Sequence, residues 1–189
     1  MANKQLIKKL DDWGVDYEVL KHKTVFTAYD VAATLKKELN EIAKTLIIQA
    51  DKHFYFVAVP ADKNLDFQKI KKAIQKMGVK VKTISIPSEK AILSKLKINP
   101  GKISGFASAH KLPSIIDKDL AKKKKVVFSA GDVKESIWMA VKDYLKVEEP
   151  RVEIIGVKRK IKKEKGKSKK VSKKKTVSKR VKSGRKKRK

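Results

Sequence analysis

The sequence predicts an α+β fold in which a mixed β-sheet is flanked by helices and followed by a disordered basic C-terminal tail. Helical and strand patterns interleave over residues 1–150. The connections between the predicted strands vary between hairpins and crossovers, which favours a mixed sheet over a doubly wound one. The chain has 189 residues, 50 of them Lys or Arg and 20 Asp or Glu, and its formal net charge is +30. This length fits one domain with an appendage.

The N-terminal residues predict two helices around an extended segment. Apolar residues recur at helical spacing from Leu6 to Trp13, and Gly14 is a good helix stop. Residues 15–20 are expected to be extended. The segment Thr27–Asp30 resembles a capping box, and apolar residues follow it at helical positions from Val31 to Leu39.

The middle of the chain predicts a hairpin, a helix and a further strand. Residues 46–48 and 54–59 are two apolar strand segments about a tight turn at Asp51-Lys52. Apolar residues spaced i, i+3, i+4, i+7 predict a helix from Asp66 to Met77. Alternating apolar residues then predict a strand over residues 79–84.

The remaining elements are predicted from caps and short apolar runs. Ser88 opens a short helix that ends before the break at 99–101, and Asp132 is expected to cap a last helix that continues to Leu145. Residues 151–157 add either one more strand or a linker. Three strands are predicted between the two helices, over residues 102–107, 115–116 and 126–129.

Composition excludes several classes of protein and site. No Cys occurs, so disulfides and thiolate nucleophiles are excluded. The N-terminus lacks the apolar core of a signal peptide and no 18-residue apolar run occurs, so we expect a cytoplasmic protein without a membrane partner. His22, His53 and His110 lack metal-binding spacing, and no GxSxG, P-loop or dinucleotide motif occurs. We therefore expect neither a metal nor another cofactor.

Residues 158–189 predict a disordered polycationic tail. Of these 32 residues 20 are Lys or Arg, one is acidic and none is aromatic, so the segment buries too little apolar surface to offset its ordering entropy. Such a run favours a nucleic acid as partner, bound electrostatically without base readout. A solubilising tail and an anionic membrane are less favoured alternatives. The residues expected to contact nucleic acid are Lys173, Lys174, Lys175, Arg185, Lys186, Lys187 and Arg188.

Four short motifs together carry a family resemblance. They are Ala43-Lys44-Thr45-Leu46, PGKISGFA at 100–107, PSIID at 113–117 and FSAG at 128–131. In this order and at these separations they resemble the YbaK/ProX-like aminoacyl-tRNA deacylases, which are trans-editing proteins related to the editing domain inserted in bacterial prolyl-tRNA synthetases. The resemblance covers about residues 5–146, and we assign residues 1–150 to such a domain.

The resemblance implies a barrel-like mixed sheet and hydrolysis of the ester that joins a wrong amino acid to a tRNA 3′ end. It assigns Lys44 as the catalytic residue, since a lysine ammonium can polarise the carbonyl or bind the terminal ribose and phosphate. It assigns the loop Gly101–Gly105, with Ser104, to substrate binding, because backbone N–H groups at glycines can approach an oxyanion closely. Ser129 and Gly131 are expected to line the amino-acid pocket.

The chain departs from the family at Gly105, where the family loop ends in proline, and we expect this change to loosen the loop. Asp117 and His22 are expected to have structural roles. The implied partner is aminoacylated tRNA, with prolyl-tRNA synthetase or the ribosome as further candidates. Two alternatives remain open: a non-catalytic RNA- or ribosome-binding protein that keeps the fold, and a DNA-compacting basic protein.

Overall fold

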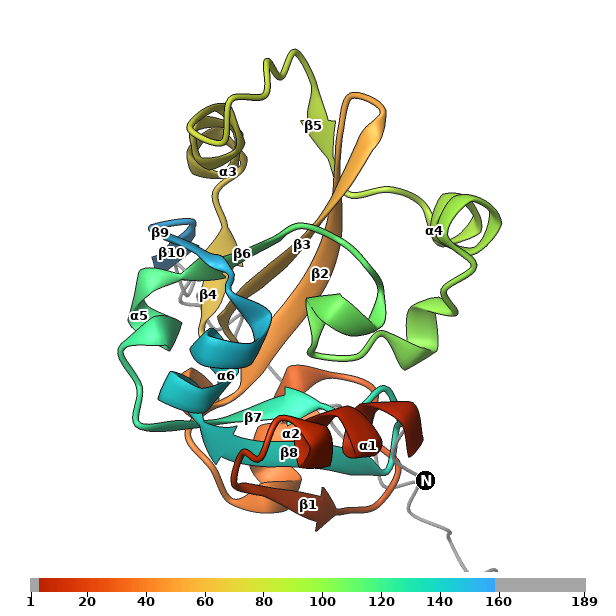
Figure 1. The fold of residues 1–189 in the computed structure, drawn as a ribbon, viewed down its shortest axis with the longest axis vertical. Helices are drawn as coiled ribbons and strands as arrows, with labels where there is room; N and C mark the ends of the chain where they lie inside the picture. The colour runs from red at the N-terminus through yellow and green to blue at the C-terminus, as the bar shows by residue number, and fades with distance from the viewer. Residues whose placement is uncertain (1–3, 159–189) are drawn as a thin grey trace, which may run out of the picture. The chain divides into compact units, whose positions relative to one another are not determined.

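The structure is a computed structural model that describes residues 4–158, and these residues form three β-sheets with six α-helices (Figure 1). The predicted tail, apart from Lys158, lies outside the described residues. The same holds for its predicted nucleic-acid contacts at 173–175 and 185–188.

The largest sheet has five strands in the order β5-β2-β3-β6-β9. The strands β2 (Ala43–Ala50) and β3 (His53–Pro60) form the predicted antiparallel hairpin, and β5 (Ile84–Ser85) pairs antiparallel with β2. On the other side β6 (Ser114–Asp117) and β9 (Arg151–Glu153) add parallel strands. The predicted mixed sheet is therefore confirmed.

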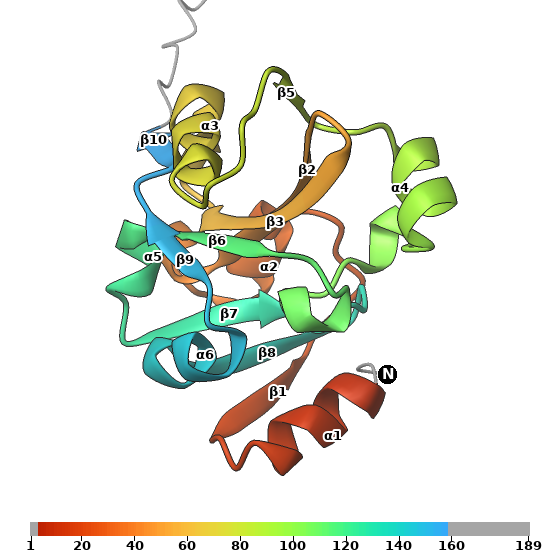
Figure 2. The same cartoon turned by 45° about the horizontal axis from the view of Figure 1, so that its top comes forward.

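Two smaller sheets complete the fold. The strands β1 (Tyr17–Lys21), β8 (Glu135–Ala140) and β7 (Lys125–Ser129) form an antiparallel sheet in the order β1-β8-β7. The strand β10 (Gly156–Lys158) pairs antiparallel with β4 (Lys63–Leu65). Figures 1 and 2 show the three-stranded sheet lying across one end of the β2–β3 hairpin. Within residues 4–158 the sheets do not close into a barrel.

Side-chain caps set the start of most helices. Thr27 and Asp30 form the predicted capping box of α2, and Asp66 and Ser88 cap α3 and α4 at the predicted starts of these helices. The α-helices are α1 (Lys4–Asp12), α2 (Ala28–Leu35), α3 (Phe67–Gln75), α4 (Glu89–Leu96), α5 (Lys118–Ala121) and α6 (Val141–Glu148). Short 3-10 helices are η1 (Leu39–Glu41), η2 (Pro100–Lys102) and η3 (Ala107–Ala109).

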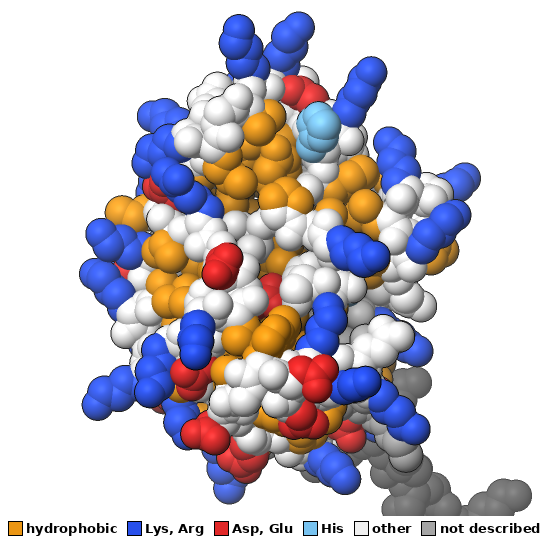
Figure 3. All heavy atoms as spheres, viewed as in Figure 1, with side chains coloured by type: hydrophobic (Ala, Val, Ile, Leu, Met, Phe, Trp, Pro, Cys, Tyr) orange, Lys and Arg blue, Asp and Glu red, His pale blue; other side chains and the backbone are white. Residues whose placement is uncertain are grey.

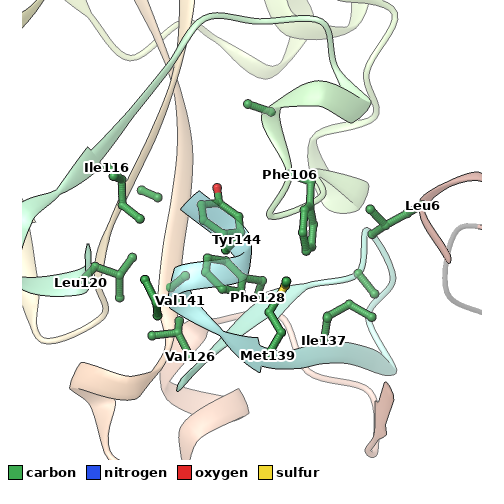
Figure 4. Packing of buried hydrophobic residues seen from close by; sticks show 14 of the residues in the cluster. Leu6, Phe106, Ile116, Leu120, Val126, Phe128, Ile137, Met139, Val141 and Tyr144 are labelled. Atoms are coloured by element: carbon green, nitrogen blue, oxygen red, sulfur yellow. The ribbon is translucent and has the colours of Figure 1, made fainter. Parts of the chain in front are cut away.

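The main core joins α6, β7, β8 and α1. The rings of Phe128 and Tyr144 stack with centroids 4.1 Å apart, and Phe106 packs against both (Figure 4). Leu6 from α1 and Met139 from β8 belong to the same buried cluster. These aromatic rings bury the largest apolar areas of this core, so they fix where the end of β7 lies.

Two further clusters cover the opposite face of the β2–β3 hairpin. Ile70 and Ile74 of α3 pack on Val57 of β3. Ala32 of α2 packs with Ile42 and Val127, where β2 begins beside β7. The helix α2 thus covers the junction between the two larger sheets.

The helix predicted from Asp132 to Leu145 is wrong in its first half. Residues 135–140 form β8, and only Val141–Glu148 are helical. Ile137 and Met139 face the main core while Trp138 faces α2, which is strand alternation. The prediction failed because Ile137, Val141 and Tyr144 happen to be spaced i, i+4, i+7 across a strand-to-helix boundary.

The strands predicted over residues 102–107 and 79–84 are wrong in whole or in part, and the structure decides between a strand and a linker after residue 150. Residues 102–107 form no strand; a single antiparallel bridge between Ser104 and Ala130 lies between η2 and η3. The strand predicted over 79–84 is reduced to Ile84–Ser85. Residues 151–158 contain the two short strands β9 and β10 rather than one strand or a linker.

Candidate active site

The strand β7 has β8 on one edge and two different neighbours on the other. Val127 forms a parallel bridge with Ile42, the residue before β2, and Ala130 forms the antiparallel bridge with Ser104. The start of β2 and the 101–105 loop therefore follow one another along a single edge of β7. This edge brings together the segments that carry the predicted site residues.

Lys44 lies beside the end of this edge. It is two residues beyond Ile42, and Ser129 is two residues beyond Val127, so each shares a face with its partner in the parallel bridge. Ile42 and Val127 both pack under α2. The register therefore places Lys44 and Ser129 at adjacent positions on the α2 side of the sheet.

The Lys44 ammonium donates a hydrogen bond to the backbone carbonyl of Lys63 in β4. The Lys63 side chain is itself buried and forms an ion pair with Asp117, 2.9 Å away, and a second with Asp119. Burial alone would lower the pKa of Lys63, but its hydrogen bonds to Asp119 and Asp117 outweigh burial and raise that pKa. Lys44 is thus held by a residue whose own position is fixed by a buried ion pair.

Asp117 is the centre of this cluster. It is fully buried, its side chain caps α5 by accepting from the Asp119 amide, and it accepts from the amides of Ile155 at 3.0 Å and Gly156 at 2.7 Å. A Cβ on Gly156 would lie 2.7 Å from Cδ of Lys63, so the packing requires glycine there. The predicted structural role of Asp117 agrees with these contacts.

Ser129 and Gly131 fasten the loop to the end of β7. The Ser129 hydroxyl donates to the carbonyl of Ile103 at 3.1 Å and accepts from the Gly131 amide at 3.1 Å. Gly131 has φ 77°, and a Cβ there would lie 3.3 Å from the Lys102 carbonyl. The structure therefore brings Ser129, Gly131 and the loop together.

Gly105 is tightly held, which contradicts the expected loosening of the loop. Its amide donates to the Ser129 carbonyl at 2.7 Å, and its carbonyl accepts from the Tyr144 hydroxyl at 3.0 Å. A Cβ at this position would lie 2.8 Å from Cβ of Phe128 and 3.0 Å from the Ser129 nitrogen. A side chain at this position would therefore require the loop to move away from β7.

Several loop amides already have acceptors inside the protein. The Gly101 amide donates to Oδ1 of Asn99 at 3.0 Å, and the Ser104 amide donates to Nε2 of His110 at 3.0 Å. With the Gly105 amide bound to Ser129, these three groups would have to exchange partners to reach an oxyanion. The substrate-binding role of Gly101, Ser104 and Gly105 remains a prediction.

A second pair of polar side chains, Ser129 and Ser136, lies on the α2 side of the sheet. Ser129 was identified from the sequence, but Ser136 was not. Ser129 pairs across the β7–β8 ladder with Ser136, whose hydroxyl lies 3.0 Å from Nε2 of His22. Nδ1 of His22 lies 2.9 Å from the carbonyl of Lys23, so in neutral His22 this nitrogen carries the proton and Nε2 accepts from Ser136. Ser136 escaped notice because it fell inside a predicted helix. The contacts of His22 fit the structural role predicted for it.

Two surface hollows on the described part of the molecule are lined by residues other than Lys44 and the 101–105 loop. One is lined mainly by α2 and the following turn, including Tyr29, Lys36 and Lys37. Another lies near Pro113 and Glu148. No helix within residues 4–158 is long and apolar enough to cross a membrane. The same residues contain no group of His, Asp and Glu side chains arranged to bind a metal.

Comparison with known proteins gives a family match. A model of the aminoacyl-tRNA editing domain matches residues 22–147, which contain Lys44, the 101–105 loop, Ser129 and Gly131. A search of the curated proteins gives no match.

Solved structures share the fold at low sequence identity. A crystal structure of a protein described only as hypothetical has a TM-score of 0.71 and 19% identity, over 81% of this chain and 99% of that one. A scaffold used for computational epitope grafting has a TM-score of 0.69 and 18% identity, over 82% and 97% of the two chains. A candidate trans-editing enzyme for prolyl-tRNA synthetase has a TM-score of 0.69 and 17% identity, over 82% and 96%.

Proposed function

Because the chain belongs to the aminoacyl-tRNA editing domain family, we propose that it hydrolyses the ester bond of mischarged aminoacyl-tRNA in trans. The observation that carries the proposal is the position of Lys44 at the start of β2, beside Ser129 and the Gly101–Gly105 loop. The same edge of β7 thus holds a cationic group and a closely packed glycine loop. An ester carbonyl requires such groups when charge develops on its oxygen.

In this mechanism Lys44 supplies electrostatic stabilisation. The hydrogen bond to the Lys63 carbonyl orients the Lys44 ammonium. The ammonium then stabilises the negative oxygen of the tetrahedral intermediate formed when water attacks the ester carbonyl. The intermediate collapses by breaking its bond to the ribose oxygen, which takes up the proton that the attacking water gives up, and the products are the free amino acid and the tRNA with its ribose hydroxyl restored.

The 101–105 loop and Ser129 shape the pocket for the amino-acid side chain. Gly105 and Gly131 admit close approach between backbone segments, and Ser129 ties the two together. Rigid packing of this kind favours discrimination by size, because a close-packed wall cannot yield to one extra methylene group without cost.

The basic tail is proposed to raise affinity for the RNA without taking part in the chemistry. Residues 158–189 carry 20 Lys or Arg, and neutralising phosphates with them releases condensed counterions. Deleting residues 159–189 should weaken tRNA binding and reduce its salt dependence. Single-turnover cleavage at saturating tRNA should be unchanged; if it fell with the deletion, the tail would belong to the active site.

The decisive experiment is single-turnover deacylation of a panel of mischarged tRNAs by the wild type, Lys44→Ala and Lys52→Ala. Lys52 is an exposed lysine in the β2–β3 turn, so its replacement controls for the loss of one charge. We expect Lys44→Ala to lower the rate by about 10²–10³-fold, the usual effect of removing one oxyanion-stabilising group. Hydrolysis of no ester, or equal rates for the two variants, would reject the mechanism.

One observation favours a second candidate, a non-catalytic RNA-binding protein. The amides of Gly101, Ser104 and Gly105 are all satisfied by internal acceptors, as expected of a loop that does not bind an oxyanion. This candidate predicts tRNA binding by the wild type together with no cleavage of any ester in the same panel.

A further inference from the structure

The segment 76–102 contains few acidic residues to offset its lysines. It contains seven lysines and no arginine, against the single acidic residue Glu89. Six of the lysines are exposed and are called the lysine surface below; they are Lys80, Lys82, Lys90, Lys95, Lys97 and Lys102. The seventh, Lys76, forms a 2.8 Å ion pair with Glu153.

The fold gathers this segment at one end of the molecule. The strand β5 pairs with the far end of β2, and α4 follows on the outer side of the β2–β3 hairpin in both views (Figures 1 and 2). The nearby carboxylate of Asp51 is occupied, because it accepts from the amides of Lys82 and Thr83 and from the Thr83 hydroxyl. Asp51 therefore fixes the segment while offsetting only one of its charges.

The acidic side chains of the described domain are unevenly distributed over its surface. Figure 3 shows Lys and Arg side chains around the upper, left-hand and right-hand margins of one face, and those at the top and right lie where β5 and α4 lie in Figure 1. The Asp and Glu side chains seen on this face gather mostly over its lower part, where α1 and β1 lie. The lysines of the upper part, which includes the β5–α4 end, therefore have fewer carboxylates near them, and this favours the approach of a polyanion there.

The lysine surface leads directly to the candidate active site. The helix α4 contacts η2, whose last residue is Lys102. The Lys102 carbonyl lies against Gly131, and the next residues form the 101–105 loop bound to β7. A nucleic acid lying along α4 would thus have its end at the loop.

Apolar side chains are interspersed among these lysines. Ile86 and Leu93 are 54% and 53% exposed, and the ammonium of Lys95 lies 5.8 Å from the centre of the Phe54 ring. A charged surface with exposed apolar groups suits a ligand with both phosphates and sugars along its backbone. It suits a membrane less, because α4 is short and Leu93 is its one large, strongly exposed apolar side chain.

We propose that the lysine surface binds the phosphate backbone of the double-stranded RNA stem that ends at the esterified 3′ terminus. This inference rests on the proposed function and adds the orientation in which the RNA binds. The stem lies along β5 and α4, and its single-stranded end enters between the 101–105 loop and Lys44. The tail raises the affinity for RNA but does not orient it, whereas the lysine surface orients the substrate.

The test compares two triple variants of the full chain. The first is Lys90→Gln, Lys95→Gln and Lys97→Gln on the lysine surface. The matched control replaces Lys118, Lys122 and Lys124 by Gln, which removes the same charge from exposed positions around α5. Dissociation constants for an RNA hairpin that reproduces a tRNA acceptor stem are measured between 50 and 300 mM salt.

We expect the first triple variant to reduce the slope of log Kd against log salt by about 2–3, because each duplex phosphate that is no longer neutralised lowers the slope by about 0.9. Its KM for mischarged tRNA should rise by at least tenfold with little change in kcat. Equal slopes for the two triple variants would overturn the inference, as would an equal loss of affinity for a single-stranded oligonucleotide of the same length.

The two proposals fail separately. If the wild type hydrolyses no ester but the first triple variant loses stem binding, the lysine surface stands and the deacylase function falls. If Lys44→Ala abolishes hydrolysis while the first triple variant binds and cleaves like the control, the function stands and the lysine surface is rejected.

Discussion

Lys63 and Lys90 carry the same side chain in opposite settings. Lys63 is 8% exposed and its ammonium is fixed between two carboxylates, whereas Lys90 lies on the outer surface of α4 among other lysines. A buried charge requires a partner at a defined distance, and removing that partner costs several kcal/mol. An exposed charge is screened by salt and contributes little to stability.

The comparison extends to the regions around the two residues. Around the candidate active site, Gly105 and Gly131 pass close to neighbouring backbone, so the local structure depends on close shape complementarity. On the lysine surface several similar charges act on one polyanion, so each is replaceable and their effects add. Substitutions in the first region should alter stability at any salt concentration, and substitutions in the second should alter binding at low salt.

The largest expected effect is that of Asp117→Ala. This change leaves Lys63 buried beside Asp119 alone and leaves the amides of Ile155 and Gly156 without their acceptor. We expect a loss of about 3–5 kcal/mol in the free energy of unfolding, measured by urea denaturation. The control is Asp119→Ala, whose 60% exposed side chain should cost less than about 1 kcal/mol.

High salt sharpens this prediction. Because buried pairs are poorly screened, the loss for Asp117→Ala should persist at about 1 M salt, where the Debye length is near 3 Å. A loss that disappeared at high salt would mean that the Lys63 cluster is hydrated, and the contrast with the lysine surface would not hold.

A smaller effect is expected for Gly105→Ala. The new methyl group would lie 2.8 Å from Cβ of Phe128 and close to the Ser129 backbone, so the loop must move away from β7. Overpacking of this kind costs about 1–3 kcal/mol. Gly101→Ala is the matched control, because its nearest neighbour would be Oδ1 of Asn99 at an ordinary 3.5 Å, and its stability should change by less than about 0.5 kcal/mol. Equal thermal stability of the two variants would disprove the close packing described for Gly105.

The smallest expected effect is a pH dependence due to His110. Burial lowers the pKa of His110 from its usual 6.5, and its neutral Nε2 accepts from the Ser104 amide. The unfolded chain therefore binds this proton at a higher pH than the folded chain does. The contribution of His110 to stability should be complete above about pH 6.5 and should decline as the pH falls through the folded-state value.

The measurement is the midpoint of urea unfolding between pH 5 and 8 for the wild type, His110→Gln and His53→Gln. His53 is exposed at the start of β3, so its replacement should preserve the wild-type profile. His110→Gln should flatten the decline. A wild-type midpoint that rose as the pH fell from 6.5 would contradict the assigned sign.

Local signals predicted much of this fold from the sequence. The capping box at Thr27, the helix starts at Asp66 and Ser88 and the hairpin turn at Asp51 depend on residues close in the chain, and all are confirmed. Strand β8 was missed because apolar residues on either side of a strand-to-helix boundary imitate one helical face. Tertiary pairing with β1 and β7 decides that segment, and spacing within it does not.

The residues of the candidate site that belong to a motif could be predicted from the sequence. The contacts between residues far apart in the chain could not. Lys44, Ser129 and Gly131 were found through the family resemblance. The contacts of Lys63 with Asp117 and of Gly105 with Tyr144 join residues separated by 54 and 39 positions, so no local pattern could reveal them. The substitution at Gly105 also could not be judged from the sequence, since its effect depends on the closeness of β7.

The pairing of β10 with β4 has a practical consequence for handling this protein. A fragment cut at residue 150, where the domain-like pattern ends in the sequence, would lose the Ile155 and Gly156 amides that hold Asp117 and the strand that pairs with Lys63. Expression fragments, purification tags and fluorescent labels should therefore be joined after Lys158. A shorter fragment would be expected to misfold, and its inactivity would say nothing about the basic tail.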